Sequence, residues 1–77
     1  MARRVIIYTR AGCADCDKEK EFFSRKGVPF EERDLGADRK YVDELTAMGI
    51  NATPVTLIDD DLVVGFELQE FETLLKE

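Results

Sequence analysis

The sequence contains no histidine, and it has only two cysteines and two prolines among its 77 residues. Histidine is the most common metal ligand and the usual general base at neutral pH, so chemistry that depends on an imidazole is excluded. A structural zinc site normally needs four cysteine or histidine ligands, and this chain offers two. The absences therefore leave the two cysteines as the candidates for chemistry.

Long hydrophobic runs and positive charge are also in short supply. The first apolar run, residues 5–8, is too short for a signal-peptide core or a membrane span, so we expect a cytoplasmic protein with no membrane partner. With 11 basic against 17 acidic residues the formal net charge is -6, which disfavours binding to nucleic acid. No repeat or linker is visible, and the length suits one domain over residues 1–77 that acts as a monomer.

The two cysteines, Cys13 and Cys16, are separated by two residues. A disulfide closed over so short a loop removes little entropy from the unfolded chain and therefore stabilises the fold little. Because a structural role for the pair is weak, the spacing favours redox chemistry.

The hydrophobic pattern predicts the order strand, helix, strand, helix, strand, strand, helix. A strand, crossover helix and second strand pair in parallel, and a later hairpin adds two antiparallel strands. The expected fold is α/β and thioredoxin-like (βαβαββα), with a four-stranded mixed sheet and helices on both faces. Asp38 is the expected N-cap of the second helix, and residues 59–61 are the expected hairpin turn. The predicted strands are 5–8, 30–34, 55–58 and 62–64, the first two helices are 14–26 and 39–48, and the last helix is lined by Leu68, Phe71, Leu74 and Leu75.

Three motifs give the chain a resemblance to the glutaredoxin family over essentially its whole length. They are Tyr-Thr-Arg (8–10) before the cysteine pair, Thr-Pro-Val (53–55), and a glycine at position 65. The Gly65-Phe66 pair is more similar to the glutaredoxin-like redoxins that supply electrons to ribonucleotide reductase. The resemblance implies an enzyme, a dithiol oxidoreductase that reduces protein disulfides and needs no bound cofactor.

The sequence departs from the family pattern where glutathione would bind. Family members often carry Pro-Tyr between the cysteines, whereas this chain has Ala14 and Asp15, so the tyrosine that lines the glutathione groove is absent. The family's Gly-Gly-x-Asp is Val64-Gly65-Phe66-Glu67 in this chain, so one of the two glycines is missing, and Glu67 stands where an acid would receive the glutathione amine. Two electron donors therefore remain open, namely glutathione as a co-substrate and a thioredoxin-reductase-type flavoprotein.

The position of the cysteines at a predicted helix start assigns them different roles. Unpaired amide hydrogens and the positive end of the helix dipole favour the thiolate of Cys13, which is the attacking form. Cys16 lies one turn deeper on the same face and is the resolving thiol. Asp15, a negative charge between the two sulfurs, opposes thiolate formation at Cys13.

The remaining candidate residues are predicted to contact a substrate or glutathione. Arg10 supplies a positive charge beside the thiolate or is a solvated loop arginine. Pro54 resembles the family's cis proline, which would turn the Thr53 backbone toward a substrate; an ordinary trans proline at a strand start is the alternative. Gly65, Phe66 and Glu67 complete this predicted surface. Tyr8 is either a second aromatic wall beside Phe66 or a core residue, and it is not counted among the site residues.

Two further alternatives arise from the same residues. Glu19 follows Cys16 by three positions, so it is either an ordinary surface glutamate or a partly buried carboxylate that accepts the Cys16 proton. A different class of function is a glutaredoxin-like protein in which the Cys13 thiolates of two chains bridge an iron-sulfur cluster or a metal. No metal ligands besides the cysteines are predicted within one chain.

Overall fold

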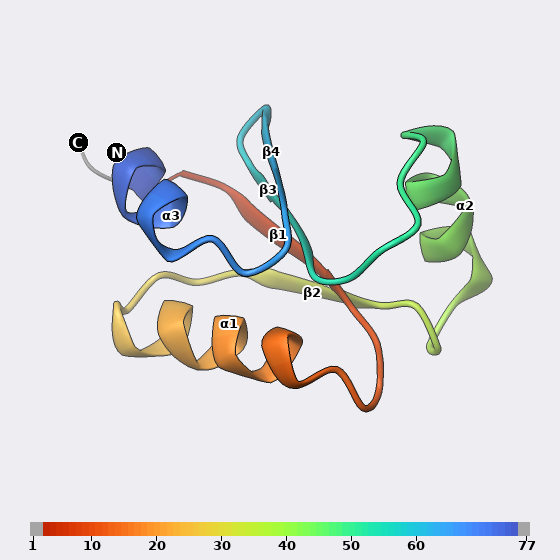
Figure 1. Ribbon diagram of the computed structural model, residues 1–77, viewed down its shortest axis with the longest axis horizontal. Helices are drawn as coiled ribbons and strands as arrows, with labels where there is room; N and C mark the ends of the chain where they lie inside the picture. Colours follow the sequence, from red (N-terminus) through yellow and green to blue (C-terminus); the bar gives the residue numbers. More distant parts are fainter. Residues whose placement is uncertain (1–2, 76–77) are drawn as a thin grey trace.

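The computed structural model describes residues 3–75 (Figure 1). It confirms the predicted order of elements and the thioredoxin-like α/β fold. None of the helices in this range is long and apolar enough to span a bilayer. The elements are β1 (Val5–Thr9), α1 (Ala14–Arg25), β2 (Glu31–Asp34), α2 (Arg39–Ala47), β3 (Val55–Ile58), β4 (Asp61–Val64) and α3 (Leu68–Leu75).

The sheet has the strand order β2-β1-β3-β4, with β1 in an interior position. All five residues of β1 are buried, as its continuous apolar and β-branched composition predicts for a strand covered on both faces. β1 pairs in parallel with β2 and antiparallel with β3, and Ile7 is the partner of both Glu32 and Thr56. β1 ends at Thr9, and the loop that follows it carries Cys13. The cysteine therefore lies at the carboxyl end of an interior strand.

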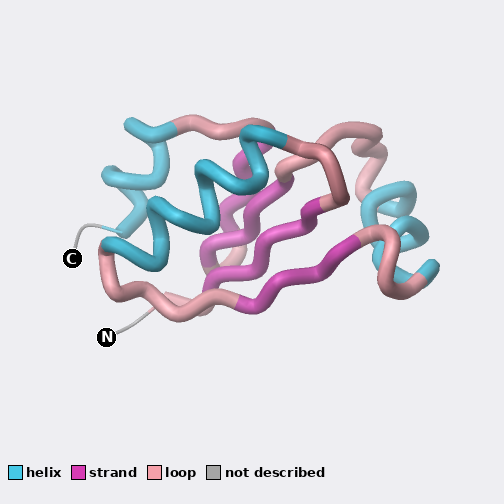
Figure 2. Tube along the Cα trace, turned by 90° about the horizontal axis from the view of Figure 1, so that it is seen from below, coloured by secondary structure: helices cyan, strands magenta, loops and turns pink. Residues whose placement is uncertain are grey.

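Helices cover both faces of the sheet, and each face has its own hydrophobic cluster. Figure 2 shows α1 and α3 together on one side of the strands, with α2 apart from them. Burial of these clusters supplies the main driving force for folding, at about 25 cal/mol per Å² of apolar surface. The cluster under α1 and α3 contains Val5, Ile7, Phe23, Ile58, Val63 and Phe71, and the cluster under α2 contains Ile6, Tyr8, Leu45 and Val55.

The boundaries differ from prediction by a residue or so, mostly for local reasons. Asp38 is the N-cap of α2, as expected, and its carboxylate accepts the Lys40 N–H at 2.9 Å. The expected three-residue hairpin turn is wrong, because Asp61 already pairs with Ile58 and only two residues remain in the loop. Asp59 makes this tight loop possible: it adopts a positive φ of 54°, and its carboxylate accepts the Arg4 N–H at 3.0 Å.

Candidate active site

Cys13 and Cys16 form a disulfide at the N-terminus of α1. Cys13 is the N-cap residue, and its sulfur accepts the backbone N–H of Cys16 at 3.1 Å. The same amide and the helix dipole would stabilise negative charge on the Cys13 sulfur after reduction. Cys13 is half-buried whereas Cys16 is only 1% exposed, so an incoming substrate meets Cys13 first.

A second segment, 40 residues further along the chain, reaches the same sulfur. The Thr53–Pro54 peptide is cis, as the family resemblance implied, and Pro54 is buried. The Thr53 hydroxyl donates to the Cys13 sulfur at 3.7 Å, a contact that sequence reasoning missed because it assigned Thr53 a backbone role only. A hydroxyl donor at this distance adds to the stabilisation of a thiolate.

The third segment, around Gly65, is joined to the cis proline. The Gly65 N–H donates to the Pro54 carbonyl at 2.8 Å, and Gly65 has a φ of +89°, which only glycine adopts readily. Glu67 is exposed, and its carboxylate lies close to Gly65. Phe66 is half-buried, with its ring 6.0 Å from that of Phe71, so its described contacts are packing contacts and its role toward a substrate stays a prediction.

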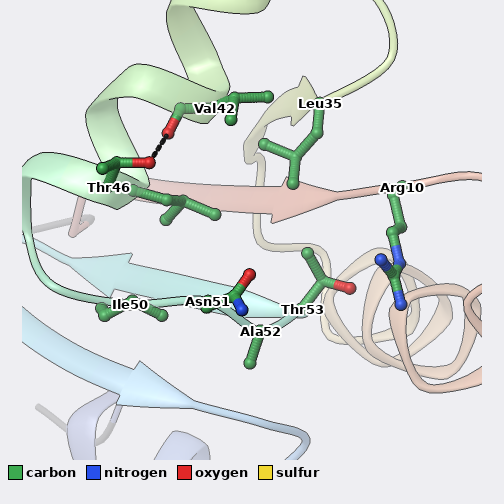
Figure 3. A pocket seen from close by; sticks show the side chains of 9 residues that line it. Arg10, Leu35, Val42, Thr46, Ile50, Asn51, Ala52 and Thr53 are labelled. Carbon is green, nitrogen blue, oxygen red and sulfur yellow. Dashed lines mark hydrogen bonds between the residues drawn. The ribbon is translucent and has the colours of Figure 1, made fainter.

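A shallow pocket extends from the cysteine loop toward α2 (Figure 3). The exposed Arg10 side chain lines its end near Thr53, so the structure places Arg10 and Thr53 in one surface. One end of the pocket carries the Arg10 cation and the Thr53 hydroxyl, and the other end carries aliphatic side chains. This lining suits an extended peptide that has an acidic or polar group near its own reacting cysteine. The remaining lining residues are Leu35, Val42, Leu45, Thr46, Ile50, Asn51 and Ala52.

Glu19 and Tyr8 are both buried, which settles two of the alternatives left by the sequence. Glu19 is fully buried on α1, so its interpretation as a surface glutamate is wrong. The Thr56 hydroxyl donates to its Oε2, and burial raises the pKa of Glu19 to about 7 although this hydrogen bond opposes the shift. Tyr8 is a core residue on the α2 side, where its hydroxyl donates to Glu44 at 2.8 Å.

The part of the chain that the structure describes brings no set of metal ligands together at the site. Among residues 3–75, no three or more His, Cys, Asp or Glu side chains are grouped to hold a metal ion. A bridged cluster of the kind considered above would therefore need ligands from a second chain or from a small molecule.

Asp15 provides a direct test of the electrostatics around the Cys13 sulfur. Its carboxylate is exposed and lies 3.9 Å from the ammonium of Lys18, which offsets part of its charge. We predict that Asp15→Asn increases the ratio of thiolate to thiol at Cys13 roughly two- to fivefold, the effect of one partly screened charge near a helix N-terminus. Thiolate absorbance followed against pH measures this ratio.

Glu21→Gln is the matched control for this experiment, since it removes one negative charge from the same helix two turns beyond the sulfur. It should leave the thiolate ratio unchanged. An unchanged or lower ratio in Asp15→Asn would show that Asp15 does not act on the Cys13 sulfur.

A dithiol at a helix N-terminus beside a cis proline, on this mixed sheet, defines a dithiol-disulfide oxidoreductase of the thioredoxin-like class. The sequence model of the glutaredoxin family matches residues 5–63, and the chain belongs to this family. The class of enzyme and the family both agree with the resemblance to glutaredoxins that the sequence motifs indicate.

Similar proteins include the glutaredoxin-like protein NrdH of Lactococcus lactis, which is 29% identical over 70 residues that cover 91% of this chain and 97% of the relative. A glutaredoxin-like 8.6 kDa protein in the rubredoxin operon of Clostridium pasteurianum is also 29% identical, over 95% of this chain and 99% of its own length. The solved structure of the glutaredoxin-like protein NrdH-redoxin from Escherichia coli superposes with a TM-score of 0.87 at 27% identity, covering 96% of this chain and 97% of that one.

Proposed function

We propose that this protein carries electrons to protein disulfides, with Cys13 as the attacking thiol and Cys16 as the resolving thiol. The observation that carries the proposal is the asymmetry of the pair. Cys13 caps the helix and reaches the surface, whereas Cys16 is buried directly behind it. Only one of the two sulfurs is thus both accessible and placed at the positive end of the helix dipole.

The catalytic cycle follows from this arrangement. The Cys13 thiolate attacks a substrate disulfide, forming a mixed disulfide and releasing one substrate thiolate. Cys16 then attacks the Cys13 sulfur, so that the second substrate thiolate leaves and the disulfide seen in the structure is formed. An extended substrate segment would pair with the Thr53 backbone, which the buried cis Pro54 and its hydrogen-bond partner Gly65 hold in place.

We propose that the physiological substrate is a disulfide of ribonucleotide reductase. Support comes from the similarity to NrdH proteins across nearly the full length of both chains and from the Gly65-Phe66 pair. The pocket beside Thr53 continues to α2 and offers such a partner a contact surface next to the cysteine pair.

We propose a thioredoxin-reductase-type flavoprotein as the electron donor. A glutathione site would consist of Arg10 for a carboxylate, the Thr53 backbone for the cysteine and Glu67 for the amine. Asp15 in place of a tyrosine leaves that site without a wall, and the net charge of -6 gives an anionic tripeptide no long-range attraction. The Escherichia coli NrdH-redoxin structure is described as the basis of a thioredoxin-like activity profile, which is consistent with a flavoprotein donor.

The donor can be tested by parallel NADPH-consumption assays with one protein disulfide as substrate. We predict a faster rate with NADPH and the flavoprotein reductase than with millimolar glutathione and glutathione reductase. A glutathione rate clearly above the flavoprotein rate would overturn the choice of donor, and no rate with either system would overturn the proposed function.

Asp15→Tyr extends this assay, because it adds the aromatic wall that other family members often have between the cysteines. The glutathione rate should rise in Asp15→Tyr but not in Asp15→Asn, which removes the same charge without adding a ring. Equal glutathione rates in the two variants would show that the wall does not limit glutathione binding.

A further inference from the structure

The buried side chains of α1 form a stripe in which a carboxyl follows the resolving cysteine. Cys16, Glu19 and Phe23 are the buried residues of this helix, at 1%, 0% and 0% exposure. Residues three apart on a helix are neighbours on one face, so Glu19 lies one turn behind Cys16 on the side facing the sheet. A glutamate at such a position is unusual, because an isolated buried carboxylate is costly.

The surroundings of Glu19 satisfy only half of its hydrogen-bonding capacity. Thr56, itself fully buried on β3, donates its hydroxyl to Oε2. Oε1 is buried without a hydrogen-bond partner among the described residues. A buried polar atom left unpaired in this way calls for an explanation, and a site for a transferred proton is one.

Charged side chains near Glu19 in the sequence are engaged elsewhere. On α1, Lys18 lies 3.9 Å from Asp15, and Lys20 lies 3.0 Å from Glu32 of β2. From β3, the group in contact with the Glu19 carboxyl is the neutral Thr56 hydroxyl. The pKa of Glu19, raised to about 7 by burial, therefore lets the carboxyl gain or lose a proton near neutral pH.

We propose that Glu19 accepts the proton of the Cys16 thiol when Cys16 resolves the mixed disulfide. This inference rests on the proposed function and assigns a proton acceptor to its second step. A proton acceptor is needed because a thiol as buried as Cys16 ionises poorly, and the sequence contains no histidine to act as a base.

The step balances without any further reactant. The Cys16 S–H bond breaks and its proton passes to Oε1 of Glu19. The Cys16 sulfur bonds to the Cys13 sulfur while the bond from Cys13 to the substrate sulfur breaks, and the substrate leaves with the electron pair as a thiolate. The proton on Glu19 then goes to water or to that thiolate, which restores the carboxylate.

Ellman's reagent separates the two chemical steps, because each releases one coloured aromatic thiolate. We expect Glu19→Gln, which keeps the shape of the side chain but cannot accept a proton, to leave the first release within about twofold of the wild type and to slow the second by about 10²-fold. The wild-type rate of the second release should rise with pH through about 7, and this inflection should be absent from the variant. Glu21→Gln, an exposed glutamate on the same helix, is the control and should behave as the wild type.

The outcomes distinguish this role from a structural one and from failure of the proposed function. A second release at the wild-type rate and with the wild-type pH profile in Glu19→Gln would overturn the proposal, even if the variant were less stable. If the variant does not fold, a wild-type second step without an inflection near neutral pH overturns it equally. Absence of the first release in the wild type would instead contradict the dithiol function itself.

Discussion

Replacement of Cys13 by serine is expected to reduce the rate of protein-disulfide reduction to that measured without the protein. Replacement of Cys16 should have a different effect, because the half-exposed Cys13 can still attack while the buried resolving thiol is gone. The Cys16→Ser protein should therefore accumulate as a mixed disulfide with its substrate. This difference follows from the position of Cys13 as N-cap and from the depth of Cys16.

Mass spectrometry of the two variants after mixing with a disulfide substrate measures this difference directly. Cys16→Ser should gain the mass of one substrate chain in a bond that a reductant cleaves, and Cys13→Ser should gain none. Trapping by Cys13→Ser in place of Cys16→Ser would reverse the roles assigned here.

The unfolding free energy of the disulfide form should fall by about 3 kcal/mol as pH rises from about 4.5 to above 7, owing to Glu19 alone. The pKa of Glu19 is about 7 in the folded protein against 4.5 as its ordinary value, so the folded state holds this proton more tightly than the unfolded state. Its contribution to stability is therefore complete below the unfolded pKa and is lost as pH rises through the folded pKa. A loss of this size is a large fraction of the stability of so small a domain.

Denaturant unfolding of the wild type and of Glu19→Gln at about pH 5 and about pH 8 isolates this contribution, because all other titrating groups are shared. The gap in unfolding free energy between the variant and the wild type should shift in favour of the variant at the higher pH. A gap that does not change with pH would show that the Glu19 carboxyl does not carry a raised pKa.

The fold could be predicted from the sequence because its signals are local. The buried run of β1 and the capping residue Asp38 each depend on neighbouring residues, and each was found at the expected place. The error at Asp61 arose because three consecutive aspartates look like a turn. Pairing with Ile58, only three residues earlier, draws the third into β4, because Asp59 adopts a positive φ that allows a two-residue loop.

In the candidate site too, the features that depend on neighbouring residues could be predicted, and those that depend on tertiary packing could not. The cysteine pair and its helix position are visible in the sequence, whereas the Thr53 hydroxyl reaches Cys13 only because two segments 40 residues apart converge. For Glu19, the spacing from Cys16 was a signal, but its burial depends on Thr56 of β3 and on the packing of α1 against the sheet. The substrate contact of Phe66 stays a prediction; the packing of its ring beside Phe22 and Phe71 is a tertiary feature that the sequence does not reveal.

Alkylation of the reduced wild-type protein, followed by mass mapping, tests the central claim most directly. With a limiting amount of iodoacetamide at neutral pH, the label should appear on Cys13 before Cys16 and faster than on either cysteine of the denatured chain, since the helix N-terminus and the Thr53 hydroxyl stabilise its thiolate. Labelling of Cys16 first, or of Cys13 no faster than in the denatured chain, would contradict the assignment of Cys13 as an activated nucleophile.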